Sequence, residues 1–112
     1  MIPVKVFYSQ PHKDKTRDEM LAASSVVVEK VRQAHPDANV VEVPMLFPEQ
    51  FKGQHPVYYL GMNLQMMCQA DVVVFAEDWQ DSRACLVQHD VCEEYGLLHV
   101  DLEGPPEKWD GR

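Results

Sequence analysis

The sequence predicts an α/β domain built on a parallel sheet, and three observations support this prediction. Apolar, β-branched runs of strand length alternate along the chain with stretches of helical periodicity. The 112 residues suit one domain with one core. A content of 46% hydrophobic and 25% charged residues is typical of a folded globular protein. Strands that alternate with helices form parallel sheets through right-handed crossovers, so four or five mainly parallel strands are expected.

The first strand and the first helix have clear local signals. Residues 4–9, VKVFYS, form a short β-branched and aromatic run that ends at a Gln-Pro pair, which predicts a buried strand. Thr16 and Glu19 have the spacing of a capping box, which marks the start of a helix. Apolar side chains then recur at helical spacing until the HPD segment at 35–37, where we expect the helix to end.

The middle of the chain predicts a strand, a long loop and a helix. The strand is expected at 39–43, NVVEV. Residues 44–56 contain three prolines and a glycine, which indicates an irregular loop, and loops of this length in small domains are usually functional or mobile. Residues 57–70 have helical periodicity despite Gly61.

The third strand is the clearest of all, at 71–77, DVVVFAE. Ser82 is then placed to cap a helix that runs to Tyr95, and Gly96 stands where a glycine commonly ends a helix. The run LLHVDL at 97–102 predicts the fourth strand.

Residues 1–102 are therefore expected to form one domain, with residues 103–112 as a tail. Parallel sheets bind ligands at the carboxyl ends of their strands. Three loops lie at these ends, at 9–15, 44–56 and 77–83, and we expect any ligand to contact them.

Net charge limits the class of partner. Eighteen acidic residues against ten basic ones give a formal charge of -8, which repels a polyphosphate backbone, so no nucleic acid polymer is expected as a partner. A small phosphorylated ligand stays possible, because one helix terminus and one or two local cations bind it whatever the net charge.

The sequence also indicates a compartment. No stretch reaches the roughly 18 apolar residues of a membrane span, and the N-terminus lacks the features of a signal peptide, so we expect a cytoplasmic protein without a membrane partner. Three cysteines without the spacing of a disulfide framework fit free thiols.

The loop after the third strand is a candidate anion site. Ser82 and Arg83 open a helix whose first N–H groups are free, and together they could hold a phosphate. The alternative is that Ser82 only caps the helix. His12 and Lys13, on the loop after the first strand, could add charge to this site or be merely solvated.

Trp79 lies on a polar loop at the strand ends, where a nucleobase could stack on it. The alternative is a surface or interface tryptophan. The chain contains no GxSxG, P-loop or GxGxxG motif, and no cofactor is expected.

One helix carries Cys85, His89 and Cys92 at i, i+4 and i+7, a stripe that could bind a metal. The same stripe should pack on the sheet, where cysteine behaves as a small hydrophobic residue, so no metal site is expected.

The segment 63–96, NLQMMCQADVVVFAEDWQDSRACLVQHDVCEEYG, resembles the nucleoside 2-deoxyribosyltransferase-like family. This family includes 2'-deoxynucleoside 5'-phosphate N-hydrolases and short, often phage-borne relatives, and the resemblance covers about residues 4–100. It implies a flavodoxin- or Rossmann-like three-layer sandwich and a homodimer, for which the Met- and Tyr-rich helix at 57–67 would provide the contact. The segment FYSQPHK at 7–13 resembles the family's first binding turn only loosely.

The departures from the family pattern fall on the catalytic positions. The family's catalytic Glu aligns with Gln88 and its assisting Asp with Asn63, while its glycine after the phosphate-binding serine is Ala84 and its first-strand tyrosine is Phe7. An amide cannot act as a nucleophile or general base. Glycosidic cleavage needs a carboxylate near its oxocarbenium-like state.

We therefore predict a nucleotide- or nucleoside-binding domain with weak or absent glycosidic cleavage, in which Gln88 holds a sugar hydroxyl. One alternative is an active N-glycosidase or deoxyribosyltransferase that uses Asp78 or Asp81. Another is a vestigial pocket on a protein-interaction domain. The expected substrate-binding residues are Phe7, Ser9, His12, Lys13, Trp79, Ser82, Arg83 and Ala84.

Overall fold

The computed structural model describes residues 3–112, except for the side chains of Gln50 and Phe51. Four parallel strands form one sheet, in the order β2-β1-β3-β4. Their bounds are Pro3–Ser9 for β1, Asn39–Glu42 for β2, Val72–Phe75 for β3 and His99–Asp101 for β4. The predicted single α/β domain with a flavodoxin- or Rossmann-like parallel sheet is confirmed.

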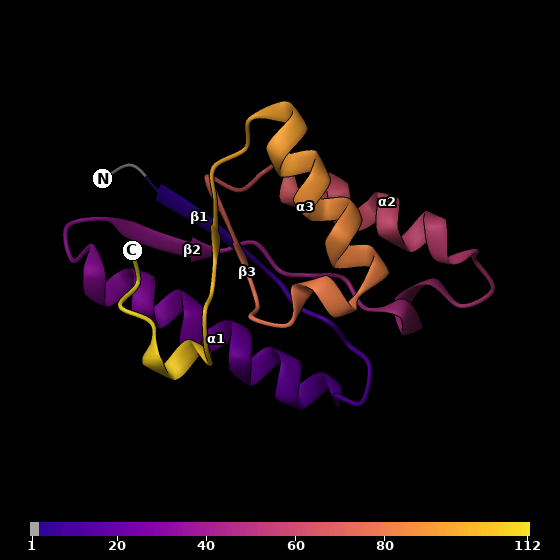
Figure 1. Cartoon of the computed structure of the whole chain (residues 1–112), viewed down its shortest axis with the longest axis horizontal. Coiled ribbons are helices and arrows are strands. Elements are labelled where there is room, and N and C mark those ends of the chain that lie inside the picture. The colour runs from indigo at the N-terminus through magenta and orange to yellow at the C-terminus, as the bar shows by residue number, and fades with distance from the viewer. Residues whose placement is uncertain (1–2) are drawn as a thin grey trace.

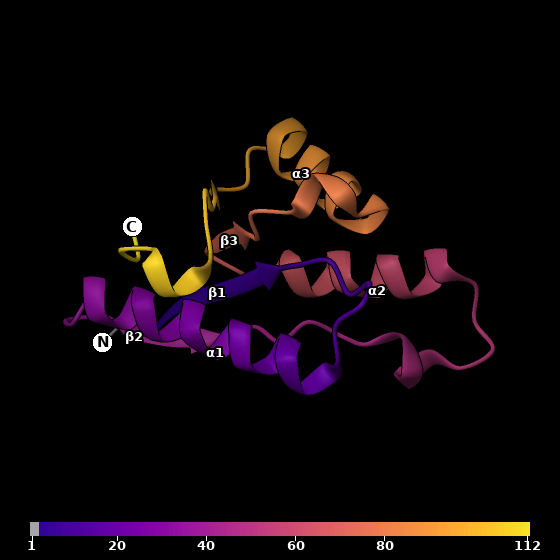
Figure 2. The same cartoon turned by 60° about the horizontal axis from the view of Figure 1, so that its bottom comes forward.

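Three α-helices cover the two faces of this sheet. Helix α1 (Arg17–Ala34) lies on one face, and α2 (Pro56–Met67) and α3 (Arg83–Tyr95) lie on the other, as Figures 1 and 2 show. None of the helices in residues 3–112 is both long and apolar enough to cross a bilayer.

The helix ends follow the local signals of the sequence. The hydroxyl of Thr16 accepts the N–H of Glu19 at 3.1 Å, and the Glu19 carboxylate accepts the N–H of Thr16 at 2.9 Å, which completes the capping box. Ser82 caps α3. Gly96 ends α3 with a φ of 72°, a left-handed conformation that glycine adopts without steric cost.

The core has two halves, one on each face of the sheet. Strand β1 serves both halves, because Val6 and Tyr8 face α1 while Phe7 faces the opposite side. The half on the α1 side comprises Val6, Tyr8, Val27, Val28, Val31, Val40, Val74, Ala76 and Leu102. The half on the side of α2 and α3 comprises Phe7, Val43, Met67, Val73, Phe75 and Cys92.

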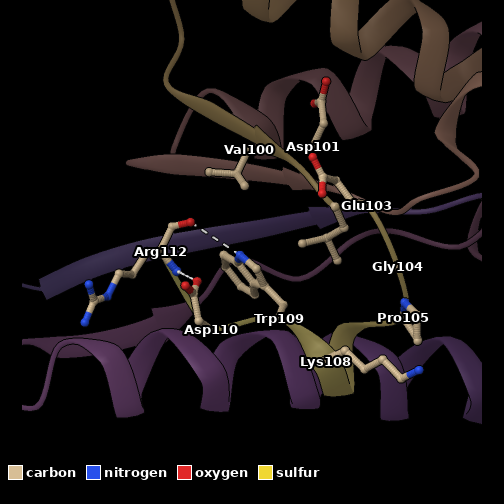
Figure 3. Close-up of a pocket in the computed structure, with 10 residues that line it drawn as sticks. Val100, Asp101, Glu103, Gly104, Pro105, Lys108, Trp109, Asp110 and Arg112 are labelled. Carbon is tan, nitrogen blue, oxygen red and sulfur yellow. Dashed lines mark hydrogen bonds between the residues drawn. The ribbon is translucent and has the colours of Figure 1, made fainter.

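Residues 103–112, which are predicted from the sequence to be a tail, fold back across α1 (Figure 2). They contain a 3-10 turn at Pro106–Lys108, and Trp109 packs against the α1-side core. Figure 3 shows the indole N–H of Trp109 donating to the Arg112 carbonyl at 3.3 Å. A cavity of about 380 Å³ lies between this segment and the end of β4.

The irregular loop predicted at 44–56 includes a 3-10 turn at Pro48–Phe51, and α2 begins with Pro56. Proline suits the first turn of a helix, because the N–H that it lacks would have no partner there. This loop and the start of α2 lie beside the carboxyl edge of the sheet, where the candidate site is found.

Candidate functional site

The strand order creates a topological switch between β1 and β3. Strand β1 pairs with β2 on one side and with β3 on the other, so the chain leaves β1 and β3 in opposite directions along the sheet. Ser9, the last residue of β1, pairs with Phe75, the last residue of β3. The loops after these strands therefore open at the same place, where doubly wound sheets form ligand crevices.

A cavity of about 700 Å³ occupies this position. Its walls come from the loop after β1, the start of α2 and the start of α3. Six of the residues that the sequence singles out line it: His12, Lys13, Asp81, Ser82, Arg83 and Ala84. The α2 wall consists of residues that the sequence did not indicate individually: His55, Pro56, Val57, Tyr59 and Leu60.

The start of α3 contributes positive groups to the cavity wall, next to the carboxylate of Asp81. The Ser82 hydroxyl accepts the N–H of Cys85 at 3.3 Å, so the capping role is observed. The earlier N–H groups of the helix have no intrahelical partner, and they lie beside the exposed side chain of Arg83. Lys13, also exposed, approaches from the loop after β1.

His12 contributes a neutral group rather than a cation near neutral pH. Burial lowers the pKa of His12 below its usual value of 6.5, and nearby Lys15 lowers it further, against the opposing effect of Glu49. The Nε2 atom of His12 lies 2.5 Å from the hydroxyl of Tyr59. Burial raises the pKa of this tyrosine, so its O–H keeps its proton, and the pair forms one hydrogen bond whose donor is set by the tautomer of His12.

Gln88 lies against the end of β1 and is 3% exposed. Its side-chain oxygen accepts the hydroxyl of the fully buried Ser9 at 2.5 Å, and this hydroxyl also lies 3.3 Å from Sγ of Cys85. In residues 3–112 the amide nitrogen of Gln88 has no hydrogen-bond partner. Every fully buried side-chain polar atom there has one, so this nitrogen keeps some contact with solvent. Gln88 and Ser9 are not among the described residues that line the cavity.

Asn63, which the predicted resemblance aligns with an assisting Asp, holds two backbone segments together. It is 1% exposed, and its amide accepts the N–H of Leu46 at 2.7 Å while donating to the carbonyls of Leu46 at 3.0 Å and Tyr59 at 3.4 Å. These bonds use both ends of the amide to fix the loop after β2 against α2. Within the described part of the chain, Asn63 does not line the cavity.

The two alternative carboxylates differ in position. Asp78 pairs with Lys15 at 3.4 Å, outside the cavity lining as far as the chain is described. Asp81 lines the cavity and is exposed. Asp81 is therefore the carboxylate that a cavity ligand could contact.

Two aromatic residues of the predicted site face elsewhere. Phe7 is fully buried in the core on the side of α2 and α3. Trp79 stacks on His89 with 3.8 Å between ring centroids and 6° between ring planes, so one face of its indole is covered. Neither ring is among the described residues of the cavity wall.

Comparison of the chain with protein-family models finds no match, and the searches of curated proteins and of solved structures find no significant match either. The resemblance to nucleoside 2-deoxyribosyltransferases therefore stays a prediction from the residues at 63–96. The geometry of the cavity supports the proposal that follows.

Proposed function

We propose that the cavity binds a small phosphorylated ligand of the deoxynucleoside monophosphate class without cleaving it. The observation that carries this proposal is the meeting of Lys13, Arg83 and the N-terminus of α3 on one cavity of about 700 Å³. A cavity of this volume suits a ligand of nucleotide size. Two cations and a helix N-terminus attract a phosphate despite the net charge of the protein.

The apolar part of the cavity wall suits the rest of such a ligand. Val57, Tyr59 and Leu60 on α2 and Val87 on α3 offer apolar and aromatic surface, on which a sugar and a base can pack. Gln88 is 3% exposed and is not among the described residues of the cavity wall, so this packing surface does not depend on its amide.

Binding without cleavage follows from the chemistry of the two amides. An oxocarbenium-like state needs a negative charge close to the sugar, and Asn63 and Gln88 provide none. A second candidate function is glycosidic cleavage assisted by Asp81, which is favoured by the position of this carboxylate on the cavity wall.

We also propose that two copies associate through the start of α2. Val57 is 64% exposed and Tyr58 is 49% exposed, and Val57 borders the cavity. A second copy seated there would remove apolar surface from water and narrow the mouth of the cavity.

Calorimetric titration with deoxynucleoside monophosphates, the matching nucleosides and inorganic phosphate tests the binding proposal. Lys13→Gln and Arg83→Gln should each weaken the binding of the monophosphates by about 1 to 2 kcal/mol, the scale of one hydrogen bond to a charged group. The binding of the nucleosides should be nearly unchanged. Lys52→Gln, an exposed lysine outside the described cavity wall, is the matched control. Absence of binding, or equal losses for both ligand types, would reject the phosphate assignment and favour a vestigial pocket on a protein-interaction domain.

Chromatography of the protein incubated with the same monophosphates separates binding from cleavage. The natural protein should release no free base over hours. Base release that Asp81→Asn abolishes would establish the second candidate.

A further inference from the structure

A cluster of metal-ligating side chains lies away from the cavity, between α3 and the edge strand β4. One ligand atom from each of His89, His99 and Asp101 lies within 4.8 Å of the other two. His89 belongs to α3, and the other two residues stand two positions apart on β4, so they point to the same face of the sheet.

The hydrogen bonds of both imidazoles orient one nitrogen of each ring for a metal. Nδ1 of His89 lies 3.0 Å from a carboxylate oxygen of Glu93, and Nδ1 of His99 lies 3.0 Å from the carbonyl oxygen of Leu97. In His99 the acceptor beside Nδ1 places the proton there and leaves Nε2 as the nitrogen that can bind a metal, whereas in His89 both ring nitrogens face carboxylates and Nε2 is the one beside Asp101. Carboxylates and backbone carbonyls are the usual outer partners of metal-binding histidines.

The carboxylate of Asp101 lies directly beside the imidazole of His89. The two carboxylate oxygens of Asp101 lie 3.0 and 2.9 Å from Nε2 of His89. Ligand atoms around a tetrahedral zinc ion are about 3.3 Å apart, so a small side-chain rotation opens the space for the ion. Trp79 stacks on His89 and holds the plane of its ring.

Exposure and charge suit a cation that enters from solvent. His89 is 5% exposed, whereas the side chain of Asp101 is 42% exposed and opens the cluster to water. Glu93 and Asp101 place two carboxylates around His89, and a divalent cation offsets their charge.

We propose that His89, His99 and Asp101 bind a divalent transition-metal ion of the zinc class. Two imidazoles and one carboxylate are a donor set for zinc, iron or cobalt and a poor one for magnesium or calcium, which prefer oxygen ligands. The bound ion ties the three-residue edge strand β4 to α3 and keeps a coordination position for water. This site is independent of the proposed nucleotide cavity.

Titration with zinc chloride near neutral pH tests the proposal, followed by calorimetry and by NMR of the histidine ring signals. Cys68 is an exposed thiol, so the titration uses the Cys68→Ser background. We expect one ion per chain and shifts confined to the rings of His89 and His99, with no response to magnesium. The three proposed ligands are unchanged in this background. Ring signals that move at His35 instead, or that do not move at all, would therefore overturn the proposal.

Variants then separate ligands from neighbours. His99→Gln and Asp101→Asn should abolish stoichiometric binding, and Glu93→Gln should weaken it by about tenfold or more, the scale for an outer partner. His35→Gln, at an exposed histidine of another element, should bind zinc like the parent protein. Unchanged affinity in the ligand variants would refute the assignment.

Discussion

Replacement of Asn63 by aspartate, the residue that the predicted resemblance places at this position, should destabilise the protein. The amide of Asn63 donates to the carbonyl of Leu46 at 3.0 Å and accepts the N–H of the same residue at 2.7 Å. An ionised carboxylate keeps only the second bond and faces the Leu46 carbonyl with a negative charge. Asn63 is 1% exposed, so water does not compensate.

The size of the effect follows from these contacts. Loss of the two donated hydrogen bonds, to the carbonyls of Leu46 at 3.0 Å and Tyr59 at 3.4 Å, costs about 1 kcal/mol in all because the second is long. Keeping a proton on a buried carboxyl or burying its charge costs about 2 kcal/mol more near neutral pH. We therefore expect Asn63→Asp to lower the free energy of unfolding by about 3 kcal/mol.

The deficit should depend on pH with a definite sign. Burial raises the pKa of the new carboxyl in the folded state above its unfolded value of about 3.9. Below the unfolded pKa both states are protonated and the charge-related deficit vanishes. As pH rises through the unfolded pKa toward the folded one, the deficit grows by at most about 1.4 kcal/mol per pH unit.

Urea unfolding of the natural protein and the variant, across acidic to neutral pH, measures this difference. Gln65→Glu, an exposed amide-to-carboxylate change two residues along the same helix, is the matched control. A neutral-pH deficit no larger than that of the control, or one that stays constant with pH, would refute the bracing role of Asn63.

Three further predictions concern other parts of the chain. Gly111→Ala should lower the free energy of unfolding by about 1 to 3 kcal/mol in thermal unfolding. The reason is that Gly111 has a φ of 85° and that a Cβ there would lie 2.1 Å from the Lys30 carbonyl oxygen. Gly104→Ala, with open space around the added Cβ, should leave stability unchanged. Cys92, whose pKa burial raises to about 11, should react with a thiol reagent only on unfolding, so fast native-state labelling would contradict its core position. Val57→Glu should give a monomer in light scattering if α2 forms the dimer contact, and an unchanged mass would exclude that contact.

Much of the fold could be predicted because its signals are local. The Thr16–Glu19 capping box, the Ser82 cap and Gly96 each act within a few residues of the helix end that they set. The strands were found from β-branched runs, and their parallel pairing follows from their alternation with helices.

The cavity could be predicted in part. The sequence indicated residues from two of its three walls, because loops at the carboxyl ends of parallel strands meet. It could not indicate that Asn63 faces the backbone of Leu46, since that contact depends on where the irregular loop lies on α2.

The histidine cluster shows a further limit of sequence patterns. His89 and His99 stand on different elements with a helix end between them, so their spacing matches no simple ligand motif. Only the packing of α3 on β4 brings the two rings to 4.9 Å between centroids. The 3-10 turn at Trp79–Asp81, before α3, stacks Trp79 on His89, which the polar sequence around this tryptophan did not suggest.

The order of the strands has a consequence for how the chain folds. Strand β1 pairs with β2 across α1, and β3 pairs with β4 across α3, so each half of the sheet is a self-contained βαβ unit. The seam between the halves joins residues far apart, as in the bond from the Lys5 N–H to the Asp71 carboxylate across 66 residues. Such distant pairings are slow to form, so we expect the halves to dock last. The cavity straddles this seam, with Lys13 on one half and Arg83 on the other. An anion bound between them would hold the two halves together and oppose unfolding.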